Sequence, residues 1–453
     1  MPSTAIVWLR RDLRLHDHPA LDAAARDHDH VVALYVLDPF FDPATGAARY
    51  RSEPRAAYLH GCLHALDARL RERGGALTVR RGDPRSVVPA LAAELDARTV
   101  LWTSDVSAFA RARDRAVTEA LLADGRQARP SSGTYVTDPS RLTTKQGAPF
   151  TVFSPFHRAW AQAERRSVLK APDRLAAPPG LDHGELPGAP RPDAGEPAAQ
   201  AAAERFLAGP IDRYHDTSNL VAGGSSELSP HLRWGTVSPR ALEERALARG
   251  GRGADAFRRQ LGWRDFYAHV LLHGIGSRRP DPDWEPDDAG ARLAAWQEGR
   301  TGYPLVDAGM RQLASSHWMH NRARLVTGSF LTKDLHLDWR LGEEHFARLL
   351  LDGEPAQNDG NWRWVASVGV DPAPAYRRMF NPTLQQRKFD PDGAYVRRWV
   401  PELRDVPLPR LFEPWTMDLA EQAAAGCVIG QDYPEPIVDH QHERRRALEL
   451  YAG

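Results

Sequence analysis

Cysteine and lysine are both scarce in this chain of 453 residues. Two cysteines, Cys62 and Cys427, are too few for a disulfide framework, a zinc knuckle or a four-cysteine iron–sulfur centre. Lysine occurs at only four positions, so arginine carries most of the positive charge. The planar guanidinium suits phosphate binding, although a GC-rich genome is the simpler explanation of the bias.

Long apolar runs are also missing. No stretch approaches the roughly 18 apolar residues of a membrane helix, and the apolar start before Arg10 is too short for a signal peptide. We therefore expect a cytoplasmic, bacterial protein without a membrane partner, and by default a monomer. Basic and acidic residues balance at 59 each, so any surface that binds nucleic acid must be local.

Strand and helix signals alternate over the first 132 residues. Helical stretches separate four short runs rich in β-branched residues, at 5–9, 31–37, 77–81 and 99–103. This alternation predicts an α/β Rossmann-like N-terminal domain with a parallel sheet. The segment after the first run reads RRDLRLHDHP and lacks the glycine fingerprint of a dinucleotide site.

The composition changes after residue 170. Residues 171–197 are rich in proline, glycine and alanine without periodicity, which is typical of a surface connector. From about residue 201 the apolar spacing is helical almost to the end. We expect three parts: the α/β domain at 1–132, a connector at 133–200 and a large all-α domain at 201–453.

Two polar constellations open the helical part. In GGSSELSPHLRWGTVSP, at 223–239, glycines and serines precede a helix with a capping pattern. Unpaired N–H groups and the helix dipole would hold phosphate there, but an ordinary capped helix is the favoured explanation of the string taken alone. In RRQLGWRDFY, at 258–267, one helix face carries Gln260, Trp263 and Arg264. That face either stacks on a nucleic-acid base or belongs to a buried aromatic helix.

Two more constellations lie further along. WMHNRARLVTG, at 318–328, carries Arg324 among apolar residues, so this arginine needs a carboxylate partner if it is buried. Candidates lie in DGEPAQNDGNWRW, at 352–364, which reads either as a ligand-gripping loop or as a surface turn. Residues 373–400 hold six basic and two acidic residues interleaved with aromatics, which fits a nucleic-acid groove or a solvated basic surface.

Together these strings resemble the photolyase/cryptochrome family, and closely its bacterial class I cyclobutane pyrimidine dimer photolyases. Further matching strings run in family order: WLRRDLRLHDHPAL, AWQEGRTGYPLVDAGMRQL, SFLTKDLHLDWRLGE, FNPTLQQRKFD and RRWVPELRDVP. The resemblance implies an antenna domain, and a helical domain that holds FAD in a U shape. The implied enzyme is a lyase that splits cyclobutane dimers in UV-damaged DNA, using an electron from excited reduced FAD.

The resemblance assigns most constellation residues to FAD. Those expected at its phosphates and ribityl chain are Tyr214, Ser225, Ser226, Leu228 and Ser229. Asp352 and Glu354 would contact its isoalloxazine and adenosine parts, with Arg324 paired to Asp352. Asn358 would face the central-ring nitrogen of the flavin. Plant cryptochromes carry aspartate there, and an amide favours the anionic reduced flavin because it adds no like charge.

Other residues are expected near the reacting groups. Trp362, Trp339 and a third tryptophan, placed at Trp284, would form the electron relay that reduces the flavin in light. The residues expected near flavin or lesion are Trp263, Arg264 and Asn321. Trp263 and Trp364 would form the walls of the lesion pocket. Arg377 and Arg378 would bind the flanking phosphates. Flipping out a dimer costs less than flipping an intact pair, because a dimer is already poorly stacked.

Two positions depart from the class I pattern. Gln260 stands where these enzymes carry glutamate in contact with the dimer, and Leu325 stands where they carry methionine. Glutamine hydrogen-bonds but supplies neither proton nor charge, so we expect repair with an altered yield.

Two alternative functions stay open. A cryptochrome-like photoreceptor without repair would use the same FAD site and relay, but Asn358, the short C-terminus and the basic segment argue against it. Repair of (6-4) photoproducts fits Gln260, yet that subgroup carries histidine where this chain has Asn321. Folate-binding members carry Asn-Glu where this chain reads Phe109-Ala110, so 8-hydroxy-5-deazaflavin is the more expected antenna chromophore if one is bound.

Overall fold

The computed structural model describes residues 2–284 and 290–451, which form two compact units. Unit 1 contains Met1–His215, Ser226–Gly274 and Glu354–Ala356; unit 2 contains Asp216–Ser225, Ile275–Gly353 and Gln357–Gly453. Unit 1 thus combines the sheet with helices from the part we had assigned to the all-α domain. The three-part division of the chain remains a proposal.

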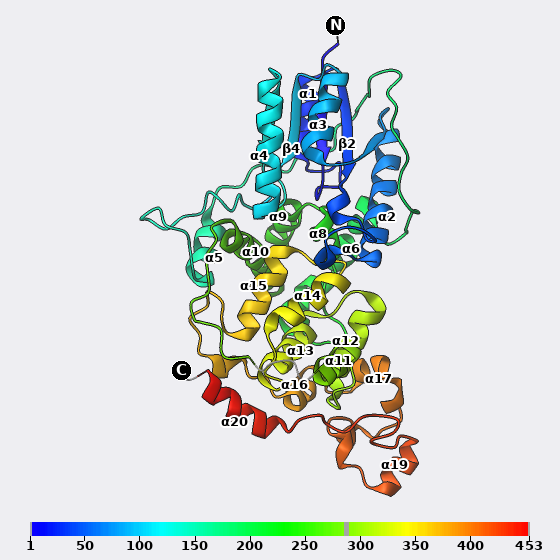
Figure 1. Cartoon of the computed structure of the whole chain (residues 1–453), viewed down its shortest axis with the longest axis vertical. Coiled ribbons are helices and arrows are strands. Elements are labelled where there is room, and N and C mark those ends of the chain that lie inside the picture. The colour runs from blue at the N-terminus through cyan, green and yellow to red at the C-terminus, as the bar shows by residue number, and fades with distance from the viewer. Residues whose placement is uncertain (1, 285–289, 452–453) are drawn as a thin grey trace. The chain divides into compact units, whose positions relative to one another are not determined.

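Unit 1 is built on a five-stranded, entirely parallel sheet in the order β3-β2-β1-β4-β5 (Figure 1). Its strands are β1 (Thr4–Leu9), β2 (His30–Leu37), β3 (Leu77–Arg81), β4 (Thr99–Thr103) and β5 (Gln127–Ser131). Ile6 of β1 lies opposite Val32 and Val100 in the neighbouring strands. β1 and β4 are buried along their whole length, as expected of a parallel sheet covered on both faces. The predicted α/β domain is confirmed.

Helices surround the sheet and continue through the rest of unit 1. They are α1 (Pro19–Asp27), α2 (Glu53–Arg71), α3 (Pro84–Glu94), α4 (Ala108–Ala123), α5 (Phe153–Gln162), α6 (Gly195–Ala208), α7 (Pro210–Thr217, which ends in unit 2), α8 (Ser229–Trp234), α9 (Pro239–Arg249) and α10 (Gly251–Leu272), with 3-10 turns η1 (Pro39–Phe41) and η2 (Ala48–Tyr50). α10 packs against α9 and α5. Its 22 residues therefore have a fixed orientation within the unit.

Unit 2 is helical, as predicted for this part of the chain. Its elements are α11 (Gly290–Glu298), α12 (Pro304–Ser316), α13 (Asn321–Lys333), α14 (Trp339–Leu349), α15 (Pro355–Ala366, which starts in unit 1), η3 (Ala375–Arg378), α16 (Pro382–Phe389), α17 (Ala394–Trp399), η4 (Pro401–Leu403), α18 (Leu408–Leu411), η5 (Pro414–Thr416), α19 (Leu419–Ala425) and α20 (His440–Leu450). α12 and α13 are buried on nearly every side and form the centre of its core. No helix in the described ranges is both long and apolar enough to cross a membrane.

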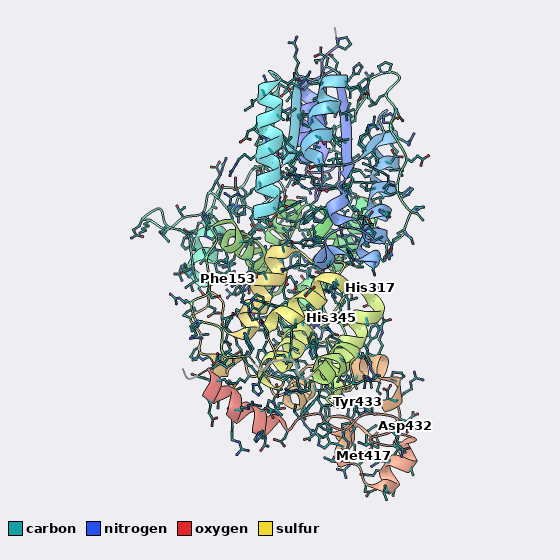
Figure 2. The ribbon with its side chains drawn as sticks, viewed as in Figure 1. Phe153, His317, His345, Met417, Asp432 and Tyr433 are labelled. Carbon is teal, nitrogen blue, oxygen red and sulfur yellow. The ribbon has the colours of Figure 1, made fainter. Side chains whose placement is uncertain are left out.

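A buried carboxylate fixes the entrance to α12. Asp307 is fully buried and accepts hydrogen bonds from Thr301, at both its backbone N (2.7 Å) and its Oγ1 (2.6 Å). Tyr433, labelled in Figure 2, donates its hydroxyl to the other oxygen at 2.6 Å. Burial of the carboxylate raises the pKa of Asp307, and these hydrogen bonds offset part of the cost of burying its charge.

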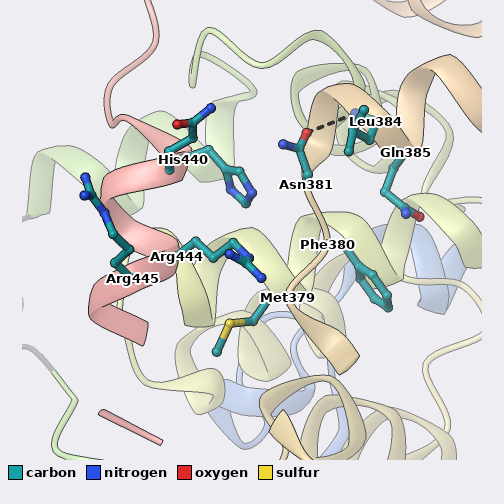
Figure 3. Close-up of a pocket in the computed structure, with 9 residues that line it drawn as sticks. Met379, Phe380, Asn381, Leu384, Gln385, His440, Arg444 and Arg445 are labelled. Carbon is teal, nitrogen blue, oxygen red and sulfur yellow. Dashed lines mark hydrogen bonds between the residues drawn. The ribbon is translucent and has the colours of Figure 1, made fainter. Parts of the chain in front are cut away.

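The C-terminal helix α20 is tied to the end of α13. His440 Nδ1 lies 2.5 Å from Oδ1 of buried Asp334, whose pKa burial raises. Beside this pair is a surface hollow of about 640 Å³, toward which His440 and Arg444 point from α20, facing Asn381 (Figure 3). None of the predicted flavin or lesion residues lines this hollow.

Candidate functional site

The predicted site residues belong to both units. Unit 1 carries Tyr214, Ser226, Leu228, Ser229, Gln260, Trp263, Arg264 and Glu354, whereas unit 2 carries Ser225, Trp284, Asn321, Arg324, Leu325, Trp339, Asp352, Asn358, Trp362, Trp364, Arg377 and Arg378.

An aromatic stack fixes the α10 face in unit 1. Trp263 lies flat on Phe153 of α5, with ring centroids 3.6 Å apart and planes at 7° (Phe153 is labelled in Figure 2). The Arg259 guanidinium lies 4.8 Å from the centroid of the same Phe153 ring. Trp263 remains half-buried and Gln260, one turn earlier, is exposed. The face that the sequence singled out therefore presents an oriented indole beside a free amide.

Glu354 is the centre of a buried ionic cluster in unit 1. It accepts a hydrogen bond from the Tyr135 hydroxyl at 2.9 Å and pairs with Arg11 at 2.5 Å. Arg264 Nη2 lies 3.3 Å from its second oxygen. Burial by itself raises the pKa of Glu354, but Arg11, Arg264 and Arg233 outweigh it and lower the pKa to about 2. Both oxygens of Glu354 thus have protein partners, and these contacts anchor the loop that precedes α15. The contact of Glu354 with the adenosine part of FAD stays a prediction.

The glycine–serine segment differs from the expected capped helix. α8 begins at Ser229, but its N-cap residue is Leu228, which makes no side-chain hydrogen bond. The serine that caps a helix is Ser238, whose Oγ accepts from Ala241 N at 3.0 Å at the start of α9. Before α8, Glu227 has a positive φ of 53°, a left-handed conformation that is uncommon for non-glycine residues.

Tyr214 stands in α7 between two phenylalanines. Its ring makes edge contacts with Phe206 and Phe257, at centroid distances of 5.5 and 5.7 Å. Burial raises the pKa of its phenol to about 12. The hydroxyl therefore remains protonated at neutral pH and is a hydrogen-bond donor.

Arg324 has the carboxylate partner that its apolar sequence context required. Its Nη2 donates to Oδ2 of Asp352 at 2.7 Å, and its Nε donates to the Met319 carbonyl at 2.8 Å. The Asp352 side chain is only 4% exposed, yet its Oδ1 is buried without a hydrogen-bond partner among the described residues. A buried unpaired carboxylate oxygen is costly, so a ligand N–H or O–H donor fits this position.

Asn358 is held by Glu343 of α14. Its Nδ2 donates to the Glu343 carbonyl at 2.9 Å and to Glu343 Oε1 at 2.8 Å. Since both acceptors require the NH₂ end, these bonds fix the orientation of the amide and leave its carbonyl as the end that can accept from a ligand. Glu343, which the sequence interpretation missed, is 4% exposed.

Trp362 is packed into the core beside a glycine. Its ring meets Phe346 and Trp296 edge-on, at centroid distances of 5.0 and 6.2 Å. A Cβ on Gly342 would lie 2.2 Å from Trp362 Cη2, so only glycine admits the indole here. Trp296, which we had not placed in the relay, is fully buried.

Of the other two relay candidates, Trp339 is as buried as Trp362, and Trp284 is half-buried. Trp339 opens α14, is 3% exposed, and has the guanidinium groups of Arg340 and Arg363 at 4.7 and 5.0 Å from its ring centroid. Trp284 is half-buried and meets Tyr451 edge-on at 6.4 Å. Whether Trp284 is the third relay member remains a prediction.

The residues of unit 2 that are expected on the lesion side differ in exposure. Trp364 is half-buried and donates its indole N–H to Asp371 at 3.0 Å. Arg378 is 2% exposed, pairs with Asp371 at 2.8 Å and covers the Trp364 ring at 4.3 Å, so it orients the indole and has little surface for a phosphate. Arg377 beside it is exposed. On α13, Asn321 is exposed and Leu325, one turn later, is half-buried.

The residues present fit FAD. Its ring N–H groups and ribityl hydroxyls match the unpaired Asp352 oxygen and the oriented Asn358 amide. Ser225, which belongs to the same unit as Asp352 and Asn358, carries a hydroxyl of the kind that donates to phosphate oxygens. Both donor sets come from strings that the sequence singled out.

Sequence reasoning missed two partners that orient the site. Phe153 lies in the segment we took for a plain connector, and its aromatic string TVFSPF was the available signal. Glu343 lies in SFLTKDLHLDWRLGE, but nothing local to it indicates Asn358, fifteen residues away.

Comparison with known proteins gives consistent results. Residues 5–178 match the family model "DNA photolyase", and residues 257–453 match "FAD binding domain of DNA photolyase". A deoxyribodipyrimidine photo-lyase of Streptomyces griseus is 42% identical and covers 98% of each chain. A class III photolyase from Agrobacterium tumefaciens superposes with a TM-score of 0.91 at 36% identity, covering 100% of this chain and 98% of its own. A Synechocystis cryptochrome gives 0.90 at 29% identity and 99% of each chain.

A parallel-sheet domain together with a helical unit whose core is rich in tryptophan is the architecture of the photolyase/cryptochrome type. The chain belongs to the DNA photolyase family of enzymes and carries that family's FAD-binding domain.

Proposed function

We propose that the protein repairs cyclobutane pyrimidine dimers in DNA with an electron from light-excited, fully reduced FAD. The observation that carries this proposal is the Asn358 amide, which Glu343 orients through two hydrogen bonds. Its carbonyl accepts an N–H and places no negative charge beside a reduced, anionic ring. FAD supplies the electron when bound, and the surrounding side chains stabilise the oxidation state that donates it.

The chain's own groups would hold the cofactor at both ends. Asp352 Oδ1 accepts from a ring or ribityl donor, while Arg324 neutralises the same carboxylate. The hydroxyls of Ser225, Ser226 and Ser229, with the phenol of Tyr214, donate to phosphate and ribityl oxygens. Leu228 and Arg264 would line the site, and the adenosine contact of Glu354 would be made alongside its arginine cluster.

Aromatic walls would receive the dimer. The Phe153 stack orients Trp263, and the Asp371 bond and Arg378 orient Trp364. Neither indole loses side-chain entropy when a base stacks on it. Gln260, Asn321 and Leu325 would contact the dimer, and Arg377 the flanking phosphate, whereas buried Arg378 supports Trp364.

Gln260 tunes the reaction under this proposal. Its exposed amide hydrogen-bonds a pyrimidine carbonyl without providing a proton to the dimer radical anion. Gln260→Glu is expected to change the quantum yield of repair while FAD content stays constant. An unchanged yield together with unchanged dimer affinity would remove this role.

For the antenna we propose 8-hydroxy-5-deazaflavin in preference to folate. Phe109 stands where folate-binding members carry asparagine, and it stacks on Phe40 at 4.5 Å with planes at 21°. Extracting the purified protein and recording the spectrum of the released chromophores tests the assignment. A released folate would overturn it.

The function is tested with an oligonucleotide that carries one thymine dimer. Blue light should restore the thymines when the flavin is reduced, and darkness should leave the dimer intact. A parallel oligonucleotide with a (6-4) photoproduct should stay damaged. Because a cryptochrome superposes nearly as well as a photolyase, FAD-loaded protein that leaves both lesions intact in light would favour a photoreceptor.

A further inference from the structure

The tryptophan that opens α14 has a carboxylate at its indole nitrogen. Trp339 Nε1 donates to Oδ1 of Asp281 at 3.4 Å, and Arg340 Nη2 holds the other carboxylate oxygen at 2.6 Å. Trp339 is 3% exposed, whereas the Asp281 side chain is 32% exposed. Asp281 therefore joins a buried indole N–H to the solvent.

Two cations flank the same ring. The guanidinium carbons of Arg340 and Arg363 lie 4.7 and 5.0 Å from its centroid. Arg363 is held there because its Nε donates to both carboxylate oxygens of Asp359 and its Nη1 donates to Ser277 Oγ at 2.9 Å. These cations stabilise the neutral indole through its electron-rich face, but they repel a positive charge placed on it. An oxidised Trp339 is therefore more stable after losing a proton.

We propose that Asp281 is the proton acceptor for oxidised Trp339, a role that rests on the proposed function because it needs the light-driven relay. With FAD bound, which would supply the light-driven oxidant, Trp362 would lose an electron and an electron from Trp339 would refill it. The Nε1–H bond of the Trp339 radical cation then breaks, its electron pair stays on the ring, and its proton goes to Asp281 Oδ1.

The products are a neutral indolyl radical and a neutral carboxylic acid, with the electron on the flavin. The proton then exchanges with water through the exposed part of Asp281. Recombination becomes slow because the electron cannot return to the neutral radical without a proton. The relay is thereby trapped at Trp339, and Trp284 is not required for trapping.

The contact itself is tested in the FAD-loaded full chain by nuclear magnetic resonance of ¹⁵N-labelled indoles. Trp339→Phe identifies the Trp339 resonance as the one that disappears. Asp281→Asn should shift that resonance, whereas Asp283→Asn, an equal charge change in the same segment at an exposed position, should not. An unmoved resonance in Asp281→Asn would overturn the contact.

The proton transfer is tested by flash absorption of the oxidised-flavin protein. The wild type should form the neutral indolyl radical more slowly in deuterium oxide than in water, and Trp284→Phe should retain it. Asp281→Asn should lose the neutral radical and recombine faster, and Asp283→Asn should behave as the wild type. Equal behaviour of Asp281→Asn and wild type, or loss of the neutral radical in Trp284→Phe, would refute the proposal.

A repair assay with chemically reduced flavin distinguishes failure of the proposed repair function from failure of the proposed role of Asp281. Repair by reduced enzyme does not use the relay, so Asp281→Asn should repair dimers at the wild-type rate. If the wild type fails that assay, the proposed function fails, while the radical measurements still decide the role of Asp281.

Discussion

Replacing Glu354 by glutamine removes a buried carboxylate that contacts Arg11, Arg264 and Tyr135 inside unit 1. The pKa of Glu354 is lowered from 4.5 to about 2, and each pKa unit corresponds to about 1.4 kcal/mol, so the ionised form stabilises the fold by about 3 kcal/mol. Glu354→Gln also removes a counter-charge from buried Arg264, whereas Arg11 keeps its ion pair with Asp105 at 3.1 Å, so the expected loss at pH 7 is about 3 kcal/mol.

The pH dependence follows from the direction of the shift. A carboxyl group whose pKa is lowered by folding contributes its full stability above the unfolded pKa of 4.5, and loses it as the pH falls toward 2. Urea unfolding followed by circular dichroism at several pH values should show a large difference between wild type and Glu354→Gln at pH 7, which shrinks below pH 4.5. The matched control is Glu204→Gln, an exposed glutamate paired with Arg245, expected to cost about 0–1 kcal/mol. A loss no larger than the control's, or a pH-independent loss, would refute the reasoning.

Three further predictions concern packing and burial. Gly342→Ala places a Cβ 2.2 Å from Trp362 Cη2 and should cost about 1–3 kcal/mol in urea unfolding; an unchanged stability would contradict the close approach. Burial lowers the pKa of Lys333 to about 7, whereas the unfolded chain keeps that proton up to about pH 10.5. Between these two pH values the free energy of unfolding of the wild type should therefore rise by about 1.4 kcal/mol per pH unit relative to Lys333→Met. A difference that stays constant with pH would argue against a buried amine. Phe153→Leu removes the stack on Trp263 and should weaken binding of a dimer oligonucleotide without loss of FAD; equal affinity would show that the stack does not orient the indole.

The sheet was largely predictable because its strands are buried. Four apolar runs became β1–β4, while β5, with the sequence QARPS, was missed. β5 is an edge strand with exposed residues and a proline, so it carries neither the continuous apolar run of β1 nor an alternating pattern. Edge strands are recognised by pairing with a neighbour, which a local sequence window does not contain.

Candidate site residues were predictable where a charged residue in an apolar segment indicated that it needs a partner of opposite charge. Arg324 among apolar residues required a carboxylate, and Asp352 supplies it. Glu354, by contrast, pairs with Arg11 across more than three hundred residues, and Tyr135, another partner, lies 219 residues away in sequence. Arg378 looked like a phosphate ligand in a basic segment, but its burial against Trp364 depends on how residues 364–378 fold back on themselves. Such pairings follow from tertiary packing and leave no periodic signal.

FAD retention is the most direct test of the account, since every proposed step needs the cofactor held by residues such as Asp352. Refolded or freshly purified protein is mixed with FAD, desalted and examined by absorption. The account predicts that wild type keeps about one FAD per chain, and that Asp352→Ala, which removes the buried acceptor, loses most of it while keeping its circular dichroism. A folded wild-type protein that retains no FAD would contradict the account.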